Sequence, residues 1–223
     1  MPSWIIGAYA IASGAVLVHK WLTDRNRSLR SDIKRVPVTP IAELIEGEAM
    51  RVTGVLRYAG TPLQSPISKR PCAAWHVLVW QLRGERRKSW ELVDDAQQSQ
   101  PFYLDAEPGS GSVRVEGAWL DLLLHPDRQA ENSVLSHVPP EFEAYLRQRE
   151  MLVHSFSWGK NAYRIHEGIL EESERVTVVG KCSRKPIAGK PGEGYRDVPM
   201  EMTLGPLDDD RLLASDEARL TTT

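Results

Sequence analysis

The chain has 223 residues, of which 41% are hydrophobic and 26% charged, and its formal net charge is −2. This composition allows a sizeable folded core, and it provides no overall positive charge that would attract nucleic acid. The only two cysteines, Cys72 and Cys182, cannot build a zinc ribbon, a RING or an iron–sulfur site by themselves. We expect both to be free thiols rather than part of a disulfide framework.

An uncharged apolar stretch stands near the start of the chain. Residues 4–18 contain no charged side chain, and tryptophans stand near both ends of the longer stretch 4–22. A helix rises about 1.5 Å per residue, so a bilayer core of about 30 Å needs roughly 20 residues. The stretch 4–22 reaches this length if Lys20 extends to the headgroups and if Trp4 and Trp21 lie at the two interfaces. The sequence therefore predicts one transmembrane helix over 4–22, anchored by these three side chains.

Basic residues dominate the segment that follows, 23–39, which we interpret as a linker. By the positive-inside rule, they place the main domain in the cytoplasm and the N-terminus outside. A signal peptide would carry positive charge before its apolar region, a soluble helix would show a polar face, and neither feature is present. The small residues of the apolar stretch leave room for a weak homodimer in the membrane. These basic residues set the topology. Some of their side chains are also candidates for contact with anionic headgroups, namely Arg25, Arg27, Arg30, Lys34 and Arg35.

Three later segments share one pattern, over residues 50–55, 113–118 and 175–180. Each is rich in β-branched residues, alternates roughly between apolar and polar, and contains glycine at or near its end. Alternation with period two predicts half-buried strands, and glycine within them indicates bends in a tightly coiled sheet. These segments predict the strands of a small β domain.

The rest of the chain adds further strands but little helix. Helix is expected over 140–148, where proline and acidic residues come first and basic ones last. The fold class is therefore β-rich, either all-β or α+β, with few short helices and one transmembrane helix before it. The expected parts are an N-terminal tip (1–3), one β-rich domain (40–207) and an acidic, frayed tail (208–223). Within the domain we expect strands over 72–82 and 102–104, and loops over 83–90, 94–100 and 184–198.

Several landmarks occur along the domain in a characteristic order. They are an acidic, glycine-containing segment before Met50–Val55, then Leu63-Gln64-Ser65-Pro66, Pro71-Cys72, Pro101–Asp105, Val113–Val115, Glu167-Gly168, Val176–Gly180 and Leu212–Ser215. This order resembles the GIDE (MULAN-like) domain, the middle part of mitochondrial outer-membrane ubiquitin ligases, which also has bacterial relatives. The resemblance covers roughly residues 40–215. It implies an OB-like, partly closed β-barrel that binds something near a membrane, and it transfers no catalytic residue.

The chain also departs from those ligases, which resemble one another in having a second membrane span and a C-terminal RING. Only thirteen residues follow Asp210, and no cysteine follows Cys182. We therefore expect a RING-less relative of the bacterial type that has no ligase activity of its own.

A search for catalytic or metal-binding groups finds none. The six histidines form no H-E-x-x-H pattern, so neither a metal site nor a cofactor is expected. Cys72 and His76 would lie roughly 13 Å apart along a strand, too far for the imidazole to activate the thiol. Cys72 is better interpreted as a small buried residue.

Five residues are candidates for ligand or partner contact. Ser65 and Pro66 match a family landmark, although a turn would explain them equally well. Trp90, Trp119 and Trp158 fall near predicted strand ends or loops, where aromatic side chains anchor partners, although core packing is their ordinary alternative.

The sequence as a whole favours a membrane-anchored, non-catalytic interaction module that engages a protein, a lipid or a small ligand near the membrane. Nucleic acid is not an expected partner, because the membrane tether and the acidic balance argue against it. The basic side chains near Trp90 supply only a small patch, at Arg83, Arg86, Arg87 and Lys88. The alternative is the substrate-recognition part of a ubiquitin ligase-like system whose RING lies on another chain.

Overall fold

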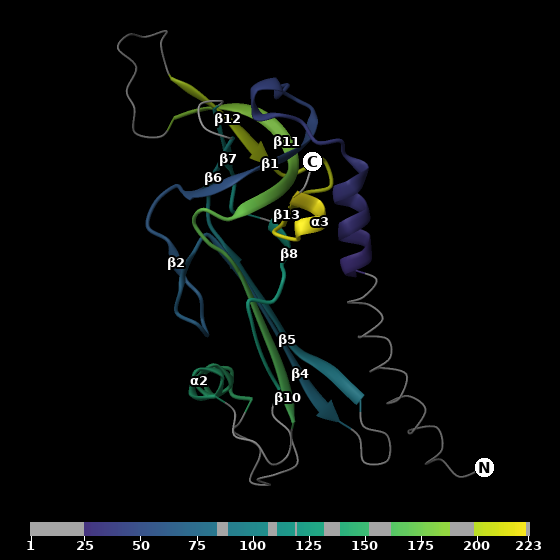
Figure 1. Cartoon of the computed structure of the whole chain (residues 1–223), viewed down its shortest axis with the longest axis vertical. Coiled ribbons are helices and arrows are strands. Elements are labelled where there is room, and N and C mark those ends of the chain that lie inside the picture. Colours follow the sequence, from purple (N-terminus) through teal and green to yellow (C-terminus); the bar gives the residue numbers. More distant parts are fainter. Residues whose placement is uncertain are drawn as a thin grey trace, which may run out of the picture.

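The computed structural model describes residues 25–83, 89–106, 111–118, 120–131, 139–151, 162–187 and 199–221. A helix over residues 25–35 comes first (Figure 1). It is followed by η1 (Ile41–Glu43), β1 (Ala49–Tyr58), β2 (Leu63–Gln64), β3 (Pro71–Cys72), β4 (Ala74–Arg83), β5 (Ser89–Ser99), β6 (Phe102–Asp105), β7 (Ser112–Val115), β8 (Leu120–Leu123), β9 (Arg128–Glu131), α2 (Pro140–Gln148), β10 (Tyr163–Leu170), β11 (Arg175–Pro186), β12 (Met200–Gly205), β13 (Leu212–Ser215) and α3 (Ala218–Thr221). The chain is thus β-rich with few short helices, as its sequence predicts.

The first sheet has seven strands, and five of them pair in a closed circuit. β1 pairs with β6, β6 with β7, β7 with β12, β12 with β11, and β11 returns to β1. Only the β7–β12 pair within this circuit is parallel. β13 and β8 continue the sheet from β11. The circuit encloses a buried apolar core that includes Val52, Leu56, Phe102, Leu104, Val113, Val115, Val178 and Leu204.

Glycines allow the two long strands of the circuit to exchange partners. Gly54 precedes the point where β1 passes from β11 to β6, and Gly180 precedes the point where β11 meets β12. A Cβ on Gly54 would lie 2.8 Å from the carbonyl oxygen of Asp105, and one on Gly180 would lie 2.6 Å from that of Gly205. Both positions therefore require glycine because backbones approach closely there.

The second sheet has four strands in the order β5-β4-β10-β9 and extends away from the first (Figure 1). Its strands come from two insertions into the circuit. β4 and β5 follow the separate β2–β3 pair between β1 and β6, and β9 and β10 flank α2 between β7 and β11. The helix α2 has the bounds that the sequence predicts, Pro140–Gln148, and packs on one face of this sheet. That core contains Ile67, Val77, Val79, Phe142, Tyr145, Leu146, Tyr163 and Ile165.

Two expected segments are more ordered than the sequence suggested. The tail was expected to fray, but β13 is buried throughout between β11 and β8, and α3 buries Leu220. The basic linker 23–39 instead contains the 25–35 helix, whose Leu29 and Ile33 are buried beside Val179. In both segments the burial of a few apolar side chains outweighs the surrounding charge and favours the ordered state.

The prediction of a loop over 94–100 is wrong, because residues 94–99 belong to β5. This strand pairs with β4 along its length, and its polar side chains are accommodated because it is an edge strand. The predicted strand over 72–82 is divided between β3 and β4.

No helix among the described residues is long and apolar enough to cross a bilayer. The predicted span, 4–22, lies outside the described residues, as do most of the predicted loops 83–90 and 184–198.

Candidate interaction surface

The second sheet has one face covered by α2 and one face that no core cluster of the described residues covers. Alternate residues of β4 such as Val77 and Val79 point to the covered face, under α2. The residues between them point to the opposite face. The residues paired with these on the neighbouring strands lie on the same face; for example, Trp80 pairs with Leu92 on β5 and with Arg164 on β10. We call this opposite side the open face; it is formed by Leu78, Trp80, Leu82, Trp90, Leu92, Arg164 and His166. Its apolar side chains are half-buried, and none belongs to any core cluster of the described residues.

Aromatic and charged groups stack on one another across the open face. The rings of Trp80 and His166 meet edge to face with centroids 4.7 Å apart. The guanidinium of Arg164 lies 4.6 Å from the ring centroid of Trp90 and donates hydrogen bonds of 2.9 and 2.8 Å to Glu131. Burial, and then the charge of Arg164, lowers the pKa of His166, which favours its neutral imidazole. The face is therefore an ordered aromatic surface of low net charge.

Arg25, the first described residue, joins the upper end of the open face to the first sheet. Its guanidinium lies 3.3 Å from Asp95 of β5 and 3.4 Å from Asp121 of β8. His76 also binds Asp95, with 2.8 Å between Nε2 and Oδ1. Burial opposes the charge of Asp95, but the bond to His76 and the nearby charge of Arg25 lower its pKa overall. Arg25, at the start of the described chain, is thus fixed beside this face.

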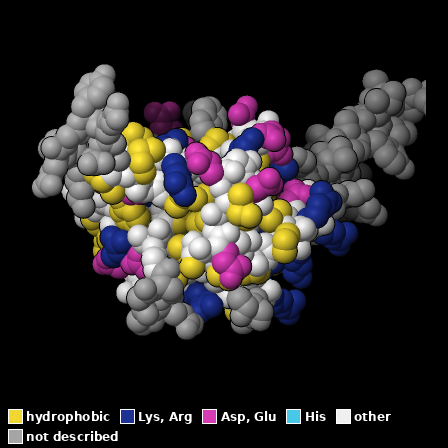
Figure 2. Space-filling view, turned by 90° about the horizontal axis from the view of Figure 1, so that it is seen from above, with side chains coloured by type: hydrophobic (Ala, Val, Ile, Leu, Met, Phe, Trp, Pro, Cys, Tyr) yellow, Lys and Arg dark blue, Asp and Glu magenta, His cyan; other side chains and the backbone are white. Residues whose placement is uncertain are grey.

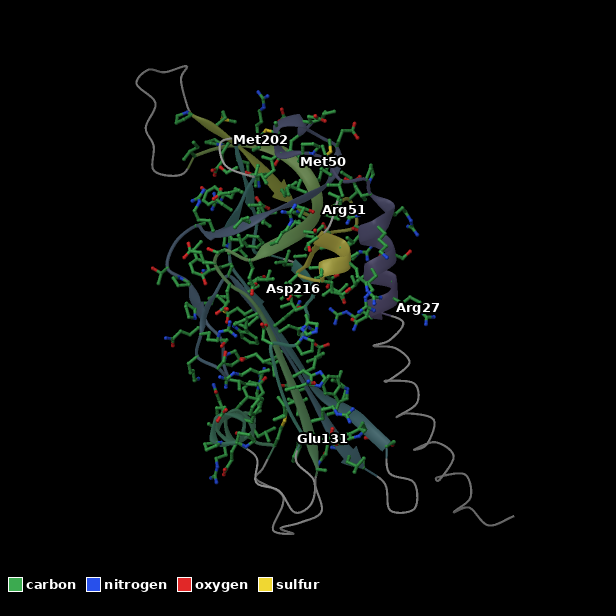
Figure 3. The ribbon with its side chains drawn as sticks, viewed as in Figure 1. Arg27, Met50, Arg51, Glu131, Met202 and Asp216 are labelled. Carbon is green, nitrogen blue, oxygen red and sulfur yellow. The ribbon has the colours of Figure 1, made fainter. Side chains whose placement is uncertain are left out.

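The other basic residues of the 25–35 helix differ in their contacts. Arg30 binds Glu217 through two nitrogens, at 2.9 and 2.5 Å, and Arg35 lies 3.7 Å from Asp32. Arg27 and Lys34 are exposed, and Figure 3 shows Arg27 near the start of the helix, on its outer side. Trp4, Lys20 and Trp21 lie outside the described residues.

The candidate pair Ser65 and Pro66 lies on the covered side of the second sheet. Ser65 is fully buried, and its Oγ lies 2.7 Å from that of Ser68. The backbone amides of Ile67 and Ser68 donate to the buried carboxylate of Glu167 at 2.9 and 3.0 Å. These bonds make the segment a buried turn, apart from the open face.

Of the candidate tryptophans, the structure places Trp90 on the open face, while Trp119 and Trp158 lie outside the described residues. Sequence reasoning did not select Trp80, Arg164 or His166. The apolar residues on both sides of β4 were a signal, because a strand with one solvated face normally alternates with polar residues.

The expectation for Cys72 is confirmed. It is fully buried, and burial, followed by the nearby Glu167 carboxylate, raises the pKa of its thiol to about 12. Both cysteines are free. Within the described ranges, no group of three His, Cys, Asp or Glu side chains could hold a metal ion.

Elsewhere, hydrophobic side chains are more scattered. At the end of the molecule seen in Figure 2 they are interspersed with acidic and basic ones. The most exposed large apolar residues in the described part are Ile45 and Met200, at 60% and 50%. Single exposed apolar residues are common on protein surfaces, so the open face remains the better candidate.

The model of the GIDE family, described as E3 ubiquitin ligase, matches residues 79–196, more than half of the chain. The chain belongs to the GIDE family. The matched part of this GIDE domain begins within β4 and holds all of the open face except Leu78. No curated protein and no solved structure matches the chain significantly.

Proposed function

We propose that this GIDE-family chain is a membrane-anchored, non-catalytic binding module that engages a ligand near the membrane through its open face. The observation that carries the proposal is the attachment of Arg25 to Asp95. It binds the side of the second sheet that carries the open face to a residue three positions after the predicted span 4–22, whose only charged side chain is Lys20. Tryptophan and arginine are enriched where proteins bind partners, and both occur on this face.

The scaffold in this proposal is an OB-like barrel. An OB-fold is a five-stranded Greek-key barrel, partly open, that supports binding surfaces on its faces and loops. The circuit β1-β6-β7-β12-β11, with its one parallel pair, supports this assignment. The two insertions that build the second sheet would then be elaborated loops of that barrel.

The proposed location is a membrane crossed once by residues 4–22, with the N-terminus outside and the domain in the cytoplasm. The apolar stretch and the basic residues after it support this arrangement. Carbonate extraction of membranes carrying the full chain, or a version lacking residues 1–24, tests it together with protease access from each side. We expect the full chain to stay in the membrane pellet. Its domain should resist protease added outside the cell and be cut by protease added on the cytoplasmic side. Release of the full chain into the supernatant would contradict the anchor.

A second candidate function is substrate recognition for a ubiquitin-like conjugation system whose RING lies on another chain. The description of the matching family, E3 ubiquitin ligase, favours it. Affinity capture of the full chain from cross-linked membranes decides between the two. A stoichiometric conjugating enzyme or RING protein supports the second candidate, and turnover of a substrate by the chain alone contradicts both.

A further inference from the structure

The short connection between the apolar stretch and the folded domain limits where the domain can lie. This limit follows from the proposed anchoring of the chain through residues 4–22. From residue 22 to Arg25, the chain can extend by at most about 11 Å. Because Arg25 is bound to Asp95 and Asp121, the upper end of the open face must lie close to the headgroups.

The second sheet cannot extend into the hydrocarbon from that point. Charged groups such as Arg164 and Glu131 lie along it, and charged side chains are costly inside a bilayer. Insertion of the sheet into the bilayer is therefore excluded, and a sheet lying along the membrane surface would turn one of its faces toward the headgroups.

The position of α2 decides which face that is. It covers one face of the second sheet, whereas the 25–35 helix lies on the opposite side of the molecule (Figure 1). The acid that binds Arg25, Asp95, is opposite Leu78 in the register and so belongs to the open-face side of β5. The face turned toward the anchor is the open one.

The side chains on this side suit an interface between water and lipid. Trp80 and Trp90 lie among three leucines, and tryptophan is enriched at the headgroup level of membranes. Arg27 and Lys34 are exposed on the helix that follows the anchor, where anionic headgroups attract basic side chains.

We propose that the open face and the exposed basic side chains of the 25–35 helix form one docking surface for an anionic bilayer. The domain then lies flat on its own membrane, held by the anchor at one end. A protein partner would bind the surfaces that remain, on the α2 side or on the first sheet.

Fluorescent labelling of the full chain in nanodiscs tests this proposal. Leu82→Cys carries an environment-sensitive dye on the open face, and Arg147→Cys carries it on the outer side of α2, where the native side chain is 71% exposed. The native cysteines are buried and stay unlabelled. With phosphatidylglycerol present, we expect the Leu82→Cys dye to be quenched by spin-labelled lipid at least twofold more than the control. Leu92→Cys provides the same measurement if the first variant does not fold.

Charge reversal provides the second arm. Arg27→Glu with Lys34→Glu should reduce that quenching at least twofold in phosphatidylglycerol discs and leave it unchanged in discs of phosphatidylcholine alone. Equal quenching of the open-face and α2 dyes overturns the proposal. Shielding of the Leu82→Cys dye only after a partner protein is added overturns it as well, in favour of a protein occupant.

The outcomes separate this inference from the proposed anchor. Retention after carbonate extraction combined with a water-exposed Leu82→Cys dye supports the anchor and rejects the docking surface. Release by carbonate, combined with selective quenching on phosphatidylglycerol vesicles, rejects the anchor and supports the docking surface.

Discussion

The outer side of the first sheet near β6 and the open face of the second sheet both lack a core cluster among the described residues, but they are built differently. On the first sheet, Arg57 binds Asp105 through two nitrogens and stacks over Tyr103, which donates to Glu201 at 3.0 Å. Polar groups there satisfy one another. On the second sheet the corresponding side carries Trp80, Trp90 and three leucines. The open face is therefore more apolar than an ordinary solvent-facing surface of this fold.

The largest contrast is expected between a core residue and an open-face residue. Phe102→Ala should lower the free energy of unfolding by about 4 kcal/mol, because it empties part of the closed core. Leu92→Ala, on the open face, should cost about 1 kcal/mol or less. Urea unfolding of both variants measures the difference. Similar losses would mean that the open face is core after all.

A smaller loss is expected on the covered side of the second sheet. Glu167→Ala removes the acceptor for the amides of Ile67 and Ser68 and should cost about 3 kcal/mol in unfolding free energy. Glu167→Gln keeps one acceptor oxygen and should cost less. The same urea titration serves, and equal stability of the alanine variant and the parent would show that the turn does not depend on this carboxylate.

The junction between β10 and β11 should make stability depend on pH. Burial, together with the carboxylates of Asp127 and Asp216, raises the pKa of Glu174 to about 7 from its ordinary 4.5. The folded state then holds its proton more tightly, so this contribution is complete below pH 4.5 and is lost as pH rises through 7. Glu174→Gln should therefore exceed the parent in stability at pH 7.5 and match it near pH 4.5.

Thermal unfolding at the two pH values measures this effect, and Glu172→Gln, on the exposed part of the same turn, is the control. If the difference in melting temperature between Glu174→Gln and the parent were the same at both pH values, the raised pKa of Glu174 would be contradicted.

The smallest effect is expected from a surface ion pair. Arg30 and Glu217 attach the 25–35 helix to the end of the chain, but the arginine side chain is 46% exposed. A double-mutant cycle of Arg30→Ala and Glu217→Ala should give a coupling energy of about 0.5 kcal/mol, falling in high salt. A coupling several times larger would mean that this pair, rather than Leu29 and Ile33, holds the helix in place.

Local signals in the sequence predicted local structure well. Proline and acids at its start gave the bounds of α2, and glycine with alternation indicated β1, β7 and β11. The circuit itself could not be predicted, because β1 pairs with β11 across most of the chain and only tertiary packing selects that partner. The 25–35 helix was missed although Leu29 and Ile33 stand four residues apart, since the basic residues around them suggested a linker.

The candidate surface was predicted only in part. Trp90 was selected as a residue near a strand end, which is where it lies. Its grouping with Leu82, and the placement of Trp80 beside Arg164, depend on the register of three strands with a bulge between Val79 and Trp80. Register is set by the whole sheet, so no single segment could reveal this face.

The interleaving of the two sheets also sets an order of events during synthesis. Residue 49 begins β1, yet its partner strand β11 begins only at residue 175. Every strand of the second sheet is made between these two points, so it can pair before the circuit closes. The second sheet can thus form while the chain is still being made, and the circuit closes last, once β11 and β12 have been added.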